Sequence, residues 1–495
     1  MRRGQALAPR VALVALAPLL LGAAATEASA PPGLQACRLR GVEHPAWCGT
    51  VRRPLDPARP AGPSIDVHVA VLPALSRQRK PDPVFFFAGG PGQSAIDLAG
   101  PVGRLLARLS NRRDLVLIDQ RGTGRSAPLR CDGDDGADRP LREAVDAEAV
   151  QQALRRCRDA LQRLPHGELR QFTTTIAAQD ADAVRRALGA GRINLVGASY
   201  GTRVALEYLR QFPQAVRRVV LDGVAPPDMA LPAAFAADAQ AAFDALLAWC
   251  EADAECRRRH PQLRAQWQAL RASLPRAVTL THPLSGRDEV VTLTAGVLAG
   301  LVRAPLYAPV LAAGLPVAIE QAAAGRWTPL AGLALALGGG RAGAVAQGQH
   351  FSVVCSEDAP RLDSDGAARP AGDFGALAET YVRACADWPR GVVPADFYRI
   401  GPAPVPVLLL SGAIDPVTPP RHGARVARAL GARARHVVVP AAGHGLLALP
   451  CVRDQVFRFV DADDEAAALA ADGGCPATRP RPPVFVAPGA AEAPR

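Results

Sequence analysis

The chain has 495 residues, of which 49% are hydrophobic, enough for one large domain with an insertion or for two domains. Its formal net charge of +11 comes almost entirely from arginine, since Lys80 is the single lysine. The arginines are dispersed and lack interleaved aromatic residues, which argues against nucleic acid as a partner and favours a compositional bias of GC-rich coding sequence.

The first 30 residues have the pattern of a cleavable signal peptide. Arg2 and Arg3 precede an apolar run over 11–25, and small residues follow it. The run is too short to span a membrane, and no cysteine follows it closely enough for a lipoprotein, so we expect no stable membrane anchor. These features predict a periplasmic or secreted protein.

Cysteine and histidine usage agrees with export and argues against a metal site. The ten cysteines form an even set, as expected in an oxidising compartment, and their order suggests pairing between neighbours without determining it. No C-x-x-C pattern occurs and the histidines are scattered, so no zinc site is indicated. We expect neither a metal nor an organic cofactor.

The first predicted strands lead to a glycine-rich loop. An edge strand is predicted over 65–71 and a buried strand over 83–87, which runs into the loop 88–94. Glycine lets the backbone approach a ligand closely, and Pro91 has no N–H, so the N–H of Gly90 is the candidate hydrogen-bond donor. A phosphate-binding loop is the alternative, but the Lys-Ser or Lys-Thr ending of such a loop is missing.

A further strand, predicted over 115–118, ends in a charged turn. The segment 119–126 reads D-Q-R-G-T-G-R-S. Charged residues with two glycines at the end of a strand predict a hydrogen-bonded turn. We expect this turn to have a structural role beneath the site that the neighbouring loops form.

The pentapeptide G-A-S-Y-G over 197–201 is the most informative feature of the chain. It stands between an apolar strand predicted over 193–196 and a helical pattern over 202–212. A G-x-S-x-G sequence between a strand and a helix is the nucleophile elbow of α/β-hydrolases, in which the serine, here Ser199, projects above the sheet edge. The turn is so tight that tiny residues must flank the serine. Taken alone, the motif could also be an ordinary glycine-rich turn.

A serine nucleophile needs a base that takes its proton and an acid that orients the base. In the chain order of α/β-hydrolases, both follow the serine. The strand predicted over 405–410 is followed by Asp415, and the short strand over 436–439 is followed by His444. Because functional groups gather beyond the carboxyl ends of parallel strands, we predict the triad Ser199–Asp415–His444.

Other residues compete for the roles of base and acid. His422 and His436 are alternative bases, although one is predicted in a helix and the other opens a strand. Asp222, which follows an earlier strand, is the rival acid. Taken singly, Asp415 could be a helix cap and His444 a loop histidine without a role.

Acyl transfer through a tetrahedral intermediate requires two hydrogen-bond donors that face the developing oxyanion. The peptide N–H of Tyr200, directly after the proposed nucleophile, is the first donor. The N–H of Gly90 in the glycine-rich loop is the second. The sequence thus predicts an oxyanion hole made of Gly90 and Tyr200.

Strands and helical segments alternate from 83 to 225, which indicates a doubly wound and mostly parallel sheet. Together with the nucleophile-elbow motif, this sheet predicts an α/β-hydrolase fold. From about 228 to 400 the chain is rich in alanine and leucine, with few strand signals, and is predicted to form an inserted helical cap. The predicted organisation is a signal peptide (1–30), the first part of the core (31–227), the cap (228–400), the second part of the core (401–475) and a flexible tail (476–495).

Five segments together resemble the prolyl iminopeptidase and tripeptidyl aminopeptidase family of α/β-hydrolase serine exopeptidases. They are G-G-P-G (89–92), D-Q-R-G-x-G-x-S (119–126), G-x-S-Y-G (197–201), D-P-V-T-P (415–419) and G-H-G (443–445). The exported, cysteine-containing members with a TAP-like C-terminal region are most similar. Ala88 stands where the intracellular prolyl iminopeptidases have a histidine, so a strict preference for N-terminal proline is not implied.

The resemblance also implies an anchor for the substrate's amino group. Aminopeptidases of this type bind the free α-ammonium with acidic residues of the cap, and the segment 351–358 is similar to their acidic cap segment. A cationic amine in a dry pocket needs an anionic partner. The resemblance implies Glu357 as the first anchor and Asp358 as the second; alternatively, both are helix-start or surface acids.

The sequence therefore predicts an exported serine exopeptidase, an aminopeptidase that hydrolyses amide bonds near the free N-terminus of peptides. An esterase or another small-molecule hydrolase with the same triad is the alternative, because fold and triad do not identify the bond that is cleaved. That alternative would fit solvent-facing Glu357 and Asp358. A non-catalytic binding protein on a hydrolase scaffold is a third possibility, against which the complete triad argues.

Overall fold

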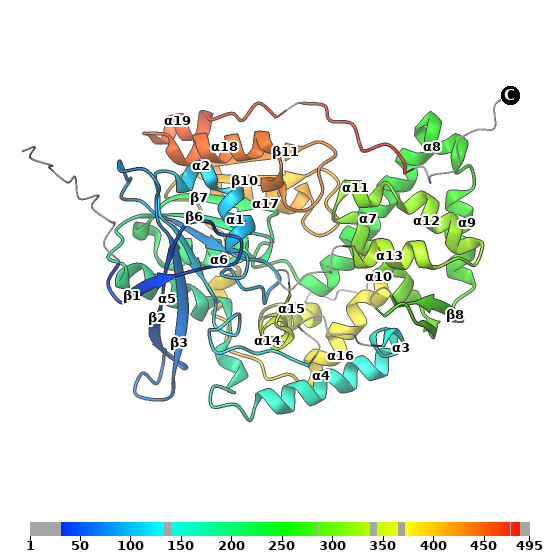
Figure 1. Cartoon of the computed structure of the whole chain (residues 1–495), viewed down its shortest axis with the longest axis horizontal. Coiled ribbons are helices and arrows are strands. Elements are labelled where there is room, and N and C mark those ends of the chain that lie inside the picture. Colours follow the sequence, from blue (N-terminus) through cyan, green and yellow to red (C-terminus); the bar gives the residue numbers. More distant parts are fainter. Residues whose placement is uncertain are drawn as a thin grey trace, which may run out of the picture.

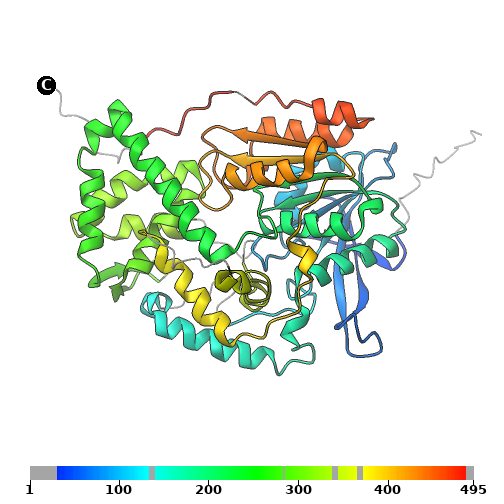
Figure 2. The ribbon, with the colours of Figure 1, turned by 180° about the vertical axis from the view of Figure 1, so that it is seen from behind.

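A computed structural model of the chain describes residues 31–132, 140–282, 285–336, 344–364, 372–475 and 477–485. The segment 1–30, expected to be a signal peptide, lies outside these ranges. Figure 1 shows a part built around a large sheet and, beside it, a mostly helical part; Figure 2 shows the same arrangement from behind.

The large sheet has nine strands in the order β1-β2-β3-β5-β4-β6-β7-β10-β11, and β8 and β9 form a separate two-stranded sheet. The strands from β5 to β11 in this order are parallel, whereas β1, β2 and β3 pair antiparallel at one edge. The predicted α/β fold with a mostly parallel sheet is confirmed. The strand bounds are β1 (Leu34–Cys37), β2 (Ala46–Pro54), β3 (Ser64–Leu72), β4 (Val84–Phe87), β5 (Leu115–Ile118), β6 (Ile193–Ala198), β7 (Val216–Asp222), β8 (Arg276–Thr281), β9 (Asp288–Leu293), β10 (Val407–Gly412) and β11 (Ala434–Val439).

Helices cover both faces of the large sheet, and other helices form the part beside it. The helices of both parts are α1 (Ala99–Leu105), α2 (Ala107–Ser110), α3 (Leu141–Val145), α4 (Ala147–Leu161), α5 (Thr174–Ala187), α6 (Tyr200–Gln211), α7 (Leu231–Ala252), α8 (Ala254–Arg259), α9 (Leu263–Ala272), α10 (Ala295–Leu306), α11 (Pro309–Ala312), α12 (Leu315–Ala323), α13 (Thr328–Leu335), α14 (Gln347–Glu357), α15 (Ala359–Ser364), α16 (Glu379–Asp387), α17 (Pro420–Leu430), α18 (Pro450–Asp461) and α19 (Glu465–Ala470).

Successive residues of each buried strand point to opposite faces of the sheet, so each strand contributes to two cores. Leu195 and Leu409 pack in one core with α5, α6 and α17. Val196 and Leu408 pack in the other core with α1, α18 and α19. Strands buried on both faces are typical of a parallel sheet covered by helices, and this is why they read as continuous apolar runs in the sequence.

Helices α7 to α13 form a second part with a core of its own. The ring of Phe243 packs edge-on against Trp267, with centroids 4.7 Å apart. The sequence predicted few strands here, and the structure adds the antiparallel pair β8 and β9. In this pair, buried Val278 and Leu280 alternate with exposed neighbours, the period-two pattern of a strand with one apolar face.

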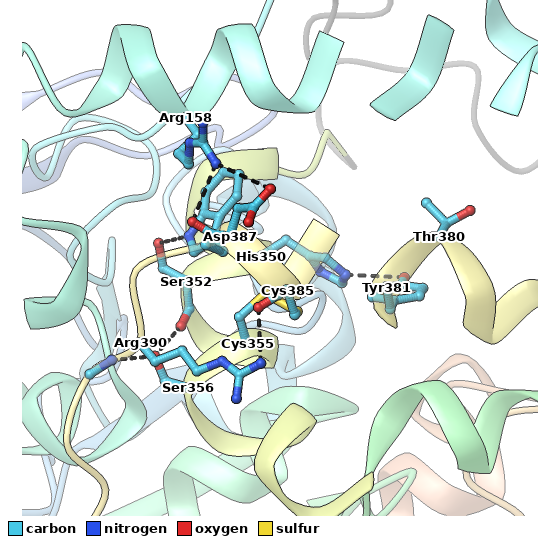
Figure 3. Close-up of a disulfide and its surroundings, with 12 residues drawn as sticks. Arg158, His350, Ser352, Cys355, Ser356, Thr380, Tyr381, Cys385, Asp387 and Arg390 are labelled. Carbon is cyan, nitrogen blue, oxygen red and sulfur yellow. Dashed lines mark hydrogen bonds and ion pairs between the residues drawn. A yellow bond between two sulfur atoms is a disulfide. The ribbon is translucent and has the colours of Figure 1, made fainter. Parts of the chain in front are cut away.

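The boundary between the two parts differs from the one predicted from composition. Helix α14 and Cys385 of α16, expected in the cap, pack in the core beside the large sheet. A disulfide between Cys355 and Cys385 ties these two helices together (Figure 3). Conversely, Leu141 and Val145 of α3, expected in the first part of the core, pack against the helical part. Hydrophobic packing, rather than position in the chain, therefore defines the two parts.

All ten cysteines form disulfides between neighbours in the sequence. The pairs are Cys37–Cys48, Cys131–Cys157, Cys250–Cys256, Cys355–Cys385 and Cys451–Cys475. Each bond closes a short loop, so each restrains the chain locally rather than joining distant segments. Five disulfides are consistent with an oxidising compartment such as the extracellular space.

The described part of the expected tail, 477–485, runs from α19 across to the helical part (Figure 1). Val484 is buried there, and the N–H of Phe485 donates to the carbonyl of Ala313 at 3.0 Å. The segment is therefore attached at this point, unlike the loose tail that its Pro/Ala-rich composition predicted. The apolar run V-F-V over 484–486, between prolines, was the available signal in the sequence.

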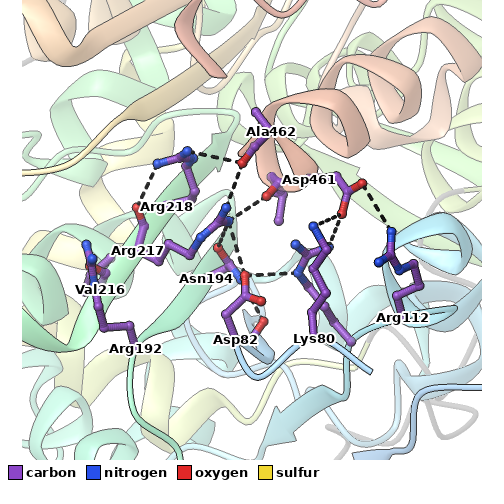
Figure 4. A network of polar contacts seen from close by, with 12 residues as sticks. Lys80, Asp82, Arg112, Arg192, Asn194, Val216, Arg217, Arg218, Asp461 and Ala462 are labelled. Atoms are coloured by element: carbon purple, nitrogen blue, oxygen red, sulfur yellow. Dashed lines mark hydrogen bonds and ion pairs between the residues drawn. The ribbon is translucent and has the colours of Figure 1, made fainter. Parts of the chain in front are cut away.

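A network of largely buried ion pairs and hydrogen bonds lies at the end of the large sheet where β4 begins, opposite the glycine-rich loop (Figure 4). The Nε of the fully buried Arg113 donates to Asp82 at 3.1 Å and its Nη1 donates to Asp461 at 2.7 Å. Asn194 and Arg217 also contact the Asp82 carboxylate, at 2.8 and 3.2 Å. Asp82 therefore contacts residues of strands β6 and β7, and Arg113 joins it to Asp461 of helix α18.

Replacing Asp82 by alanine should lower the free energy of unfolding by about 1–3 kcal/mol, because the buried Nε of Arg113 loses its acceptor while Asp461 remains as the second carboxylate partner. Chemical denaturation of Asp82→Ala and wild type measures this loss. Asp454→Ala is the matched control, since its ion pair with Arg108 is exposed and should contribute less than about 1 kcal/mol. Equal stability of the two variants would contradict the assigned role.

Candidate active site

Ser199 occupies a strained turn between strand β6 and helix α6. Its φ is 55° and its ψ is −123°, a region that non-glycine residues rarely adopt. The surrounding structure holds it there, since its N–H donates to the carbonyl of Asp222 on β7 at 2.8 Å. The flanking glycines are sterically required: a Cβ at Gly197 would lie 2.3 Å from the Gly201 oxygen, and one at Gly201 would lie 2.0 Å from the Phe87 oxygen.

Asp415 and His444 come together beyond the ends of β10 and β11. The Asp415 Oδ2 atom lies 2.8 Å from the His444 Nδ1 atom. The carboxylate also accepts hydrogen bonds from the N–H groups of Val417 and Thr418, at 2.8 and 3.0 Å, and from the Thr418 hydroxyl at 2.7 Å. These contacts hold the acid rigidly, so that it can orient the imidazole.

The charges around His444 favour its protonated form. Burial by itself lowers the pKa of His444, but the neighbouring Asp415 carboxylate outweighs that effect and leaves the pKa above its ordinary value. The positive charge of Arg303 opposes this shift. For Asp415, burial alone would raise the pKa, whereas His444 and the hydrogen bonds from Thr418 bring it below the usual range.

The rival base and acid candidates lie in other surroundings. The Nε2 atom of His422 lies 2.9 Å from Asp238 of α7, and that of His436 lies 2.9 Å from the Ser411 hydroxyl. The Asp222 carboxylate accepts the N–H groups of residues 446 and 447, at 2.9 and 3.0 Å. The Asp222 carboxylate therefore binds the backbone just after His444 rather than the His444 ring.

Ser199 and His444 line one cavity of about 530 Å³ between the sheet-containing part and the helical part. This volume lies in the usual range of small-molecule sites. Its described lining is Gly90, Gln93, Ser199, Tyr200, Arg203, Ala225, Leu231, Phe235, Gly300, Arg303, Ala304, Tyr307, Ala334, Val345, Val417, Thr418 and His444. Helices α7, α10 and α13 contribute one side of it, and loops at the sheet edge contribute the other.

Gly90 and Tyr200, the predicted oxyanion donors, both lie on this cavity. Gly90 has φ 109°, and a Cβ there would lie 2.7 Å from the nitrogen of Gly92, so only glycine fits the loop. A Cβ on Gly89 would lie 3.1 Å from that of Ser199, which places the loop directly beside the serine. The structure therefore brings the two donors and Ser199 to one place.

Two side-chain contacts hold the glycine-rich loop in this position. The hydroxyl of Ser94 donates to Asp119 at 2.6 Å, and Asp119 also accepts the N–H of Arg125 at 3.2 Å. The predicted turn over 119–126 is thus a hydrogen-bonded support for the loop, as expected. On the other side, the buried His350 of α14 contacts the Pro91 carbonyl oxygen at 3.1 Å through Nδ1. Burial lowers the pKa of His350 to about 4, so it is neutral near pH 7.

Glu357 and Asp358 do not line the described cavity, in contrast to the expectation that they bind a substrate ammonium. Both side chains are 0% exposed and form ion pairs with the equally buried Arg203, at 3.2 and 3.0 Å. Glu357 also accepts the N–H and the hydroxyl of Thr174, at 2.6 and 2.9 Å. Arg203, which does line the cavity, separates the two carboxylates from it.

The physical reason for this difference is the cationic partner that α6 supplies. Burial raises the pKa of Glu357 to about 7 even though Arg203 favours the ionised form. Without Arg203, two adjacent buried carboxylates would be very costly. The signal in the sequence was an arginine in the first turn of the helix that follows Ser199, and sequence reasoning missed it.

The sequence analysis missed three further residues at the site. Arg303 and Tyr307 of the helical part line the cavity, and the carbonyl of Tyr307 accepts the N–H of His444 at 2.9 Å. The hydroxyl of Thr418 lies 3.1 Å from His444 Nδ1. Thr418 stands in the quoted D-P-V-T-P segment, whereas nothing in the local pattern marks Arg303 or Tyr307.

No group of three or more His, Cys, Asp or Glu residues in the described ranges could hold a metal ion. None of the helices in these ranges is long and apolar enough to cross a membrane.

Comparison with protein families agrees with this architecture. Residues 82–299 match the family model described as the alpha/beta hydrolase fold, and residues 370–467 match that of TAP-like proteins. The segment that contains strands β4 to β7 is thus similar to α/β-hydrolases. The carboxyl-terminal region of the chain is similar to TAP-like proteins.

Three curated relatives are similar to part of the chain. Serine protease Hip1 of Mycobacterium tuberculosis is 34% identical over 195 residues, and the tripeptidyl aminopeptidase of Streptomyces lividans is 33% identical over 198 residues. Carboxylesterase B of Mycobacterium tuberculosis is 30% identical over 192 residues. Each match covers 37% of this chain and 36% of the relative, so the matched segment spans about a third of each relative's length.

Activity should fall as the pH drops through the pKa of His444, which lies above the ordinary value of histidine, because only neutral imidazole can accept a proton. In the pH profile, this fall in activity is the acid limb. Asp415→Asn should move the acid limb to lower pH and reduce kcat about 10⁴-fold, because it removes the charge that raises the pKa of His444 and orients its ring. A pH profile of kcat/KM measures both effects. His166→Gln, distant from the cavity, should leave the limb in place; an unmoved limb in Asp415→Asn would assign the titration to another group.

Glu357→Ala should lower the free energy of unfolding by about 3 kcal/mol, because it leaves buried donors of Arg203 and Thr174 without an acceptor. The ratio of rates for substrates with free and acetylated amino groups should stay as in wild type. Denaturation and paired kinetics measure the two effects, with the exposed Glu379→Ala as control. Loss of the amino-group preference alone, at full stability, would restore Glu357 as an amine anchor.

Proposed function

We propose that this chain is a serine hydrolase that cleaves amide bonds in peptides through an acyl-enzyme on Ser199. The observation that carries the proposal is one cavity lined by a strained serine and by a histidine whose Nδ1 lies 2.8 Å from a buried carboxylate. This arrangement supplies the nucleophile, the base and the orienting acid of acyl transfer.

In the proposed reaction, His444 takes the proton of the Ser199 hydroxyl while the oxygen attacks the scissile carbonyl carbon. The N–H groups of Gly90 and Tyr200 stabilise the negative charge on the carbonyl oxygen. The tetrahedral intermediate collapses, the C–N bond breaks, and His444 gives its proton to the leaving amine. His444 then deprotonates a water molecule, which hydrolyses the acyl-enzyme and regenerates the serine.

The finer proposal is an exported aminopeptidase that acts near a free N-terminus. Its support is the similarity to a tripeptidyl aminopeptidase and to a serine protease, together with the TAP-like segment. The five disulfides and the signal-peptide pattern support export. Recognition of the amino group would have to involve groups other than Glu357 and Asp358.

An esterase is the second candidate, and a specific observation favours it. No aspartate or glutamate belongs to the described lining of the cavity, so no carboxylate there faces a substrate ammonium. The lining is instead largely aliphatic and aromatic, which suits a neutral acyl group. The similarity to a protein named carboxylesterase B agrees with this alternative.

A comparison of rates on purified, oxidised protein separates the two candidates. The substrates are aminoacyl and tripeptidyl chromogenic amides with free amino groups, the same amides after N-acetylation, and a short-chain p-nitrophenyl ester. We expect amide cleavage that depends on the free amine and falls about 10⁴-fold or more in Ser199→Ala. Turnover of the ester without turnover of any amide would exclude the peptidase and support the esterase. Amide turnover that persists in Ser199→Ala would overturn the proposed nucleophile.

A further inference from the structure

The Arg303 guanidinium lies at the cavity and has no carboxylate partner within the described residues. Its guanidinium lies over the rings of Phe235 and Tyr307, 4.5 and 5.2 Å from their centroids. One nitrogen, Nη2, donates to the Tyr307 hydroxyl at 2.8 Å. The Nε atom is buried and makes no hydrogen bond within the described ranges. These contacts leave most of the five N–H donors of the guanidinium available.

Three other buried arginines of the described chain have acidic partners. Arg113, Arg121 and Arg203 are each within 3.2 Å of at least one aspartate or glutamate oxygen. Such pairing is expected, because an unpaired charge removed from water is costly. Aromatic faces stabilise Arg303 in part, but they do not neutralise its charge. Arg303 is thus half-buried at the cavity with its charge uncompensated by a neighbouring acid.

The surroundings of Arg303 fit an anion that carries an apolar body. No acidic residue of the described lining competes for the guanidinium. Leu231, Phe235 and Ala304 provide apolar surface beside it. A planar guanidinium with free donors binds a carboxylate through two parallel hydrogen bonds, and the Tyr307 hydroxyl can adjust to support it.

We propose that Arg303, supported by Tyr307, binds a carboxylate of the substrate and so selects substrates with an anionic group near the scissile carbonyl. The preference for an anionic substrate rests on the proposed function, whereas the carboxylate site itself does not. The carboxylate belongs either to an acidic side chain or to a free C-terminus. Both sources share the same chemistry at the guanidinium.

The same residues connect this anion site to the proposed base. The Tyr307 ring packs edge-on against His444, with centroids 5.3 Å apart, and the Tyr307 carbonyl accepts the His444 N–H. A substrate bound by Arg303 would therefore lie beside Tyr307, the side chain that packs against the imidazole of His444. Binding of the anion would orient the substrate where proton transfer takes place.

The kinetic test compares matched substrates. One chromogenic pair has glutamate or glutamine next to the scissile bond. A second pair consists of unlabelled peptides with a free or an amidated C-terminus, whose cleavage is followed by chromatography of the products. We expect kcat/KM of wild type to be about 10- to 100-fold higher for the charged member of at least one pair, and the pair affected identifies the source. Arg303→Met should bring that ratio close to one and Arg303→Lys should keep part of it.

Arg326→Met is the matched control, because it removes the same charge from an exposed position of the helical part. It should keep the wild-type ratio. Near-UV circular dichroism and thermal unfolding show whether each variant is folded. Ser199-dependent turnover with equal rates for charged and neutral members would overturn the substrate preference while leaving the proposed function intact.

A binding experiment tests the carboxylate site without relying on turnover. Calorimetry compares 3-phenylpropionate with its primary amide on wild type and Arg303→Met. We expect the acid to bind wild type at least about tenfold more tightly than the amide does, and to lose that advantage in the variant. Equal affinity of acid and amide for wild type would overturn the carboxylate site. If no substrate is turned over but the acid binds preferentially, the proposed function fails and the anion site stands.

Discussion

The close contact between Gly201 and the carbonyl oxygen of Phe87 is the constraint on which the site depends. A Cβ at position 201 would lie 2.0 Å from that oxygen, so only glycine lets helix α6 begin directly against the end of strand β4. The same contact places the glycine-rich loop beside Ser199. The strain at Ser199, with φ 55°, is then balanced by the hydrogen bond from its N–H to Asp222 on the adjacent strand.

The sheet-containing part and the helical part meet at the cavity, and each contributes different residues to its lining. The sheet edge carries the serine, the histidine and the acid, because parallel strands end there together. The helical part contributes Arg303 and Tyr307, and it is joined to the loop of His444 by the hydrogen bond from the His444 N–H to Tyr307. His422 of α17 also contacts Asp238 of α7, which ties the two parts together outside the cavity.

The charges around the cavity follow from which cations find carboxylate partners. Arg203 pairs with Glu357 and Asp358 in a fully buried cluster, so these acids stabilise the packing of α6 against α14. Arg303 has aromatic and hydroxyl neighbours instead. The described wall of the cavity therefore presents positive rather than negative charge, the reverse of what the acidic cap segment suggested. Ion pairing, more than the number of acids in a segment, decides the charge that a substrate meets.

Local patterns determined the fold class, the strand ends and the approximate places of Ser199, Asp415 and His444, because apolar runs and flanking glycines reflect short-range sterics. They could not assign Glu357, since its partner Arg203 is 154 residues away and becomes a neighbour only when α6 and α14 pack together. Arg303 and Tyr307 were missed for the same reason, as were the attachment of Val484 and the two parts to which α3 and α14 belong. The sequence by itself specified the local geometry that a nucleophile elbow needs, whereas the tertiary structure decided which charges lie together, because electrostatic partners are chosen by distance in space and not along the chain.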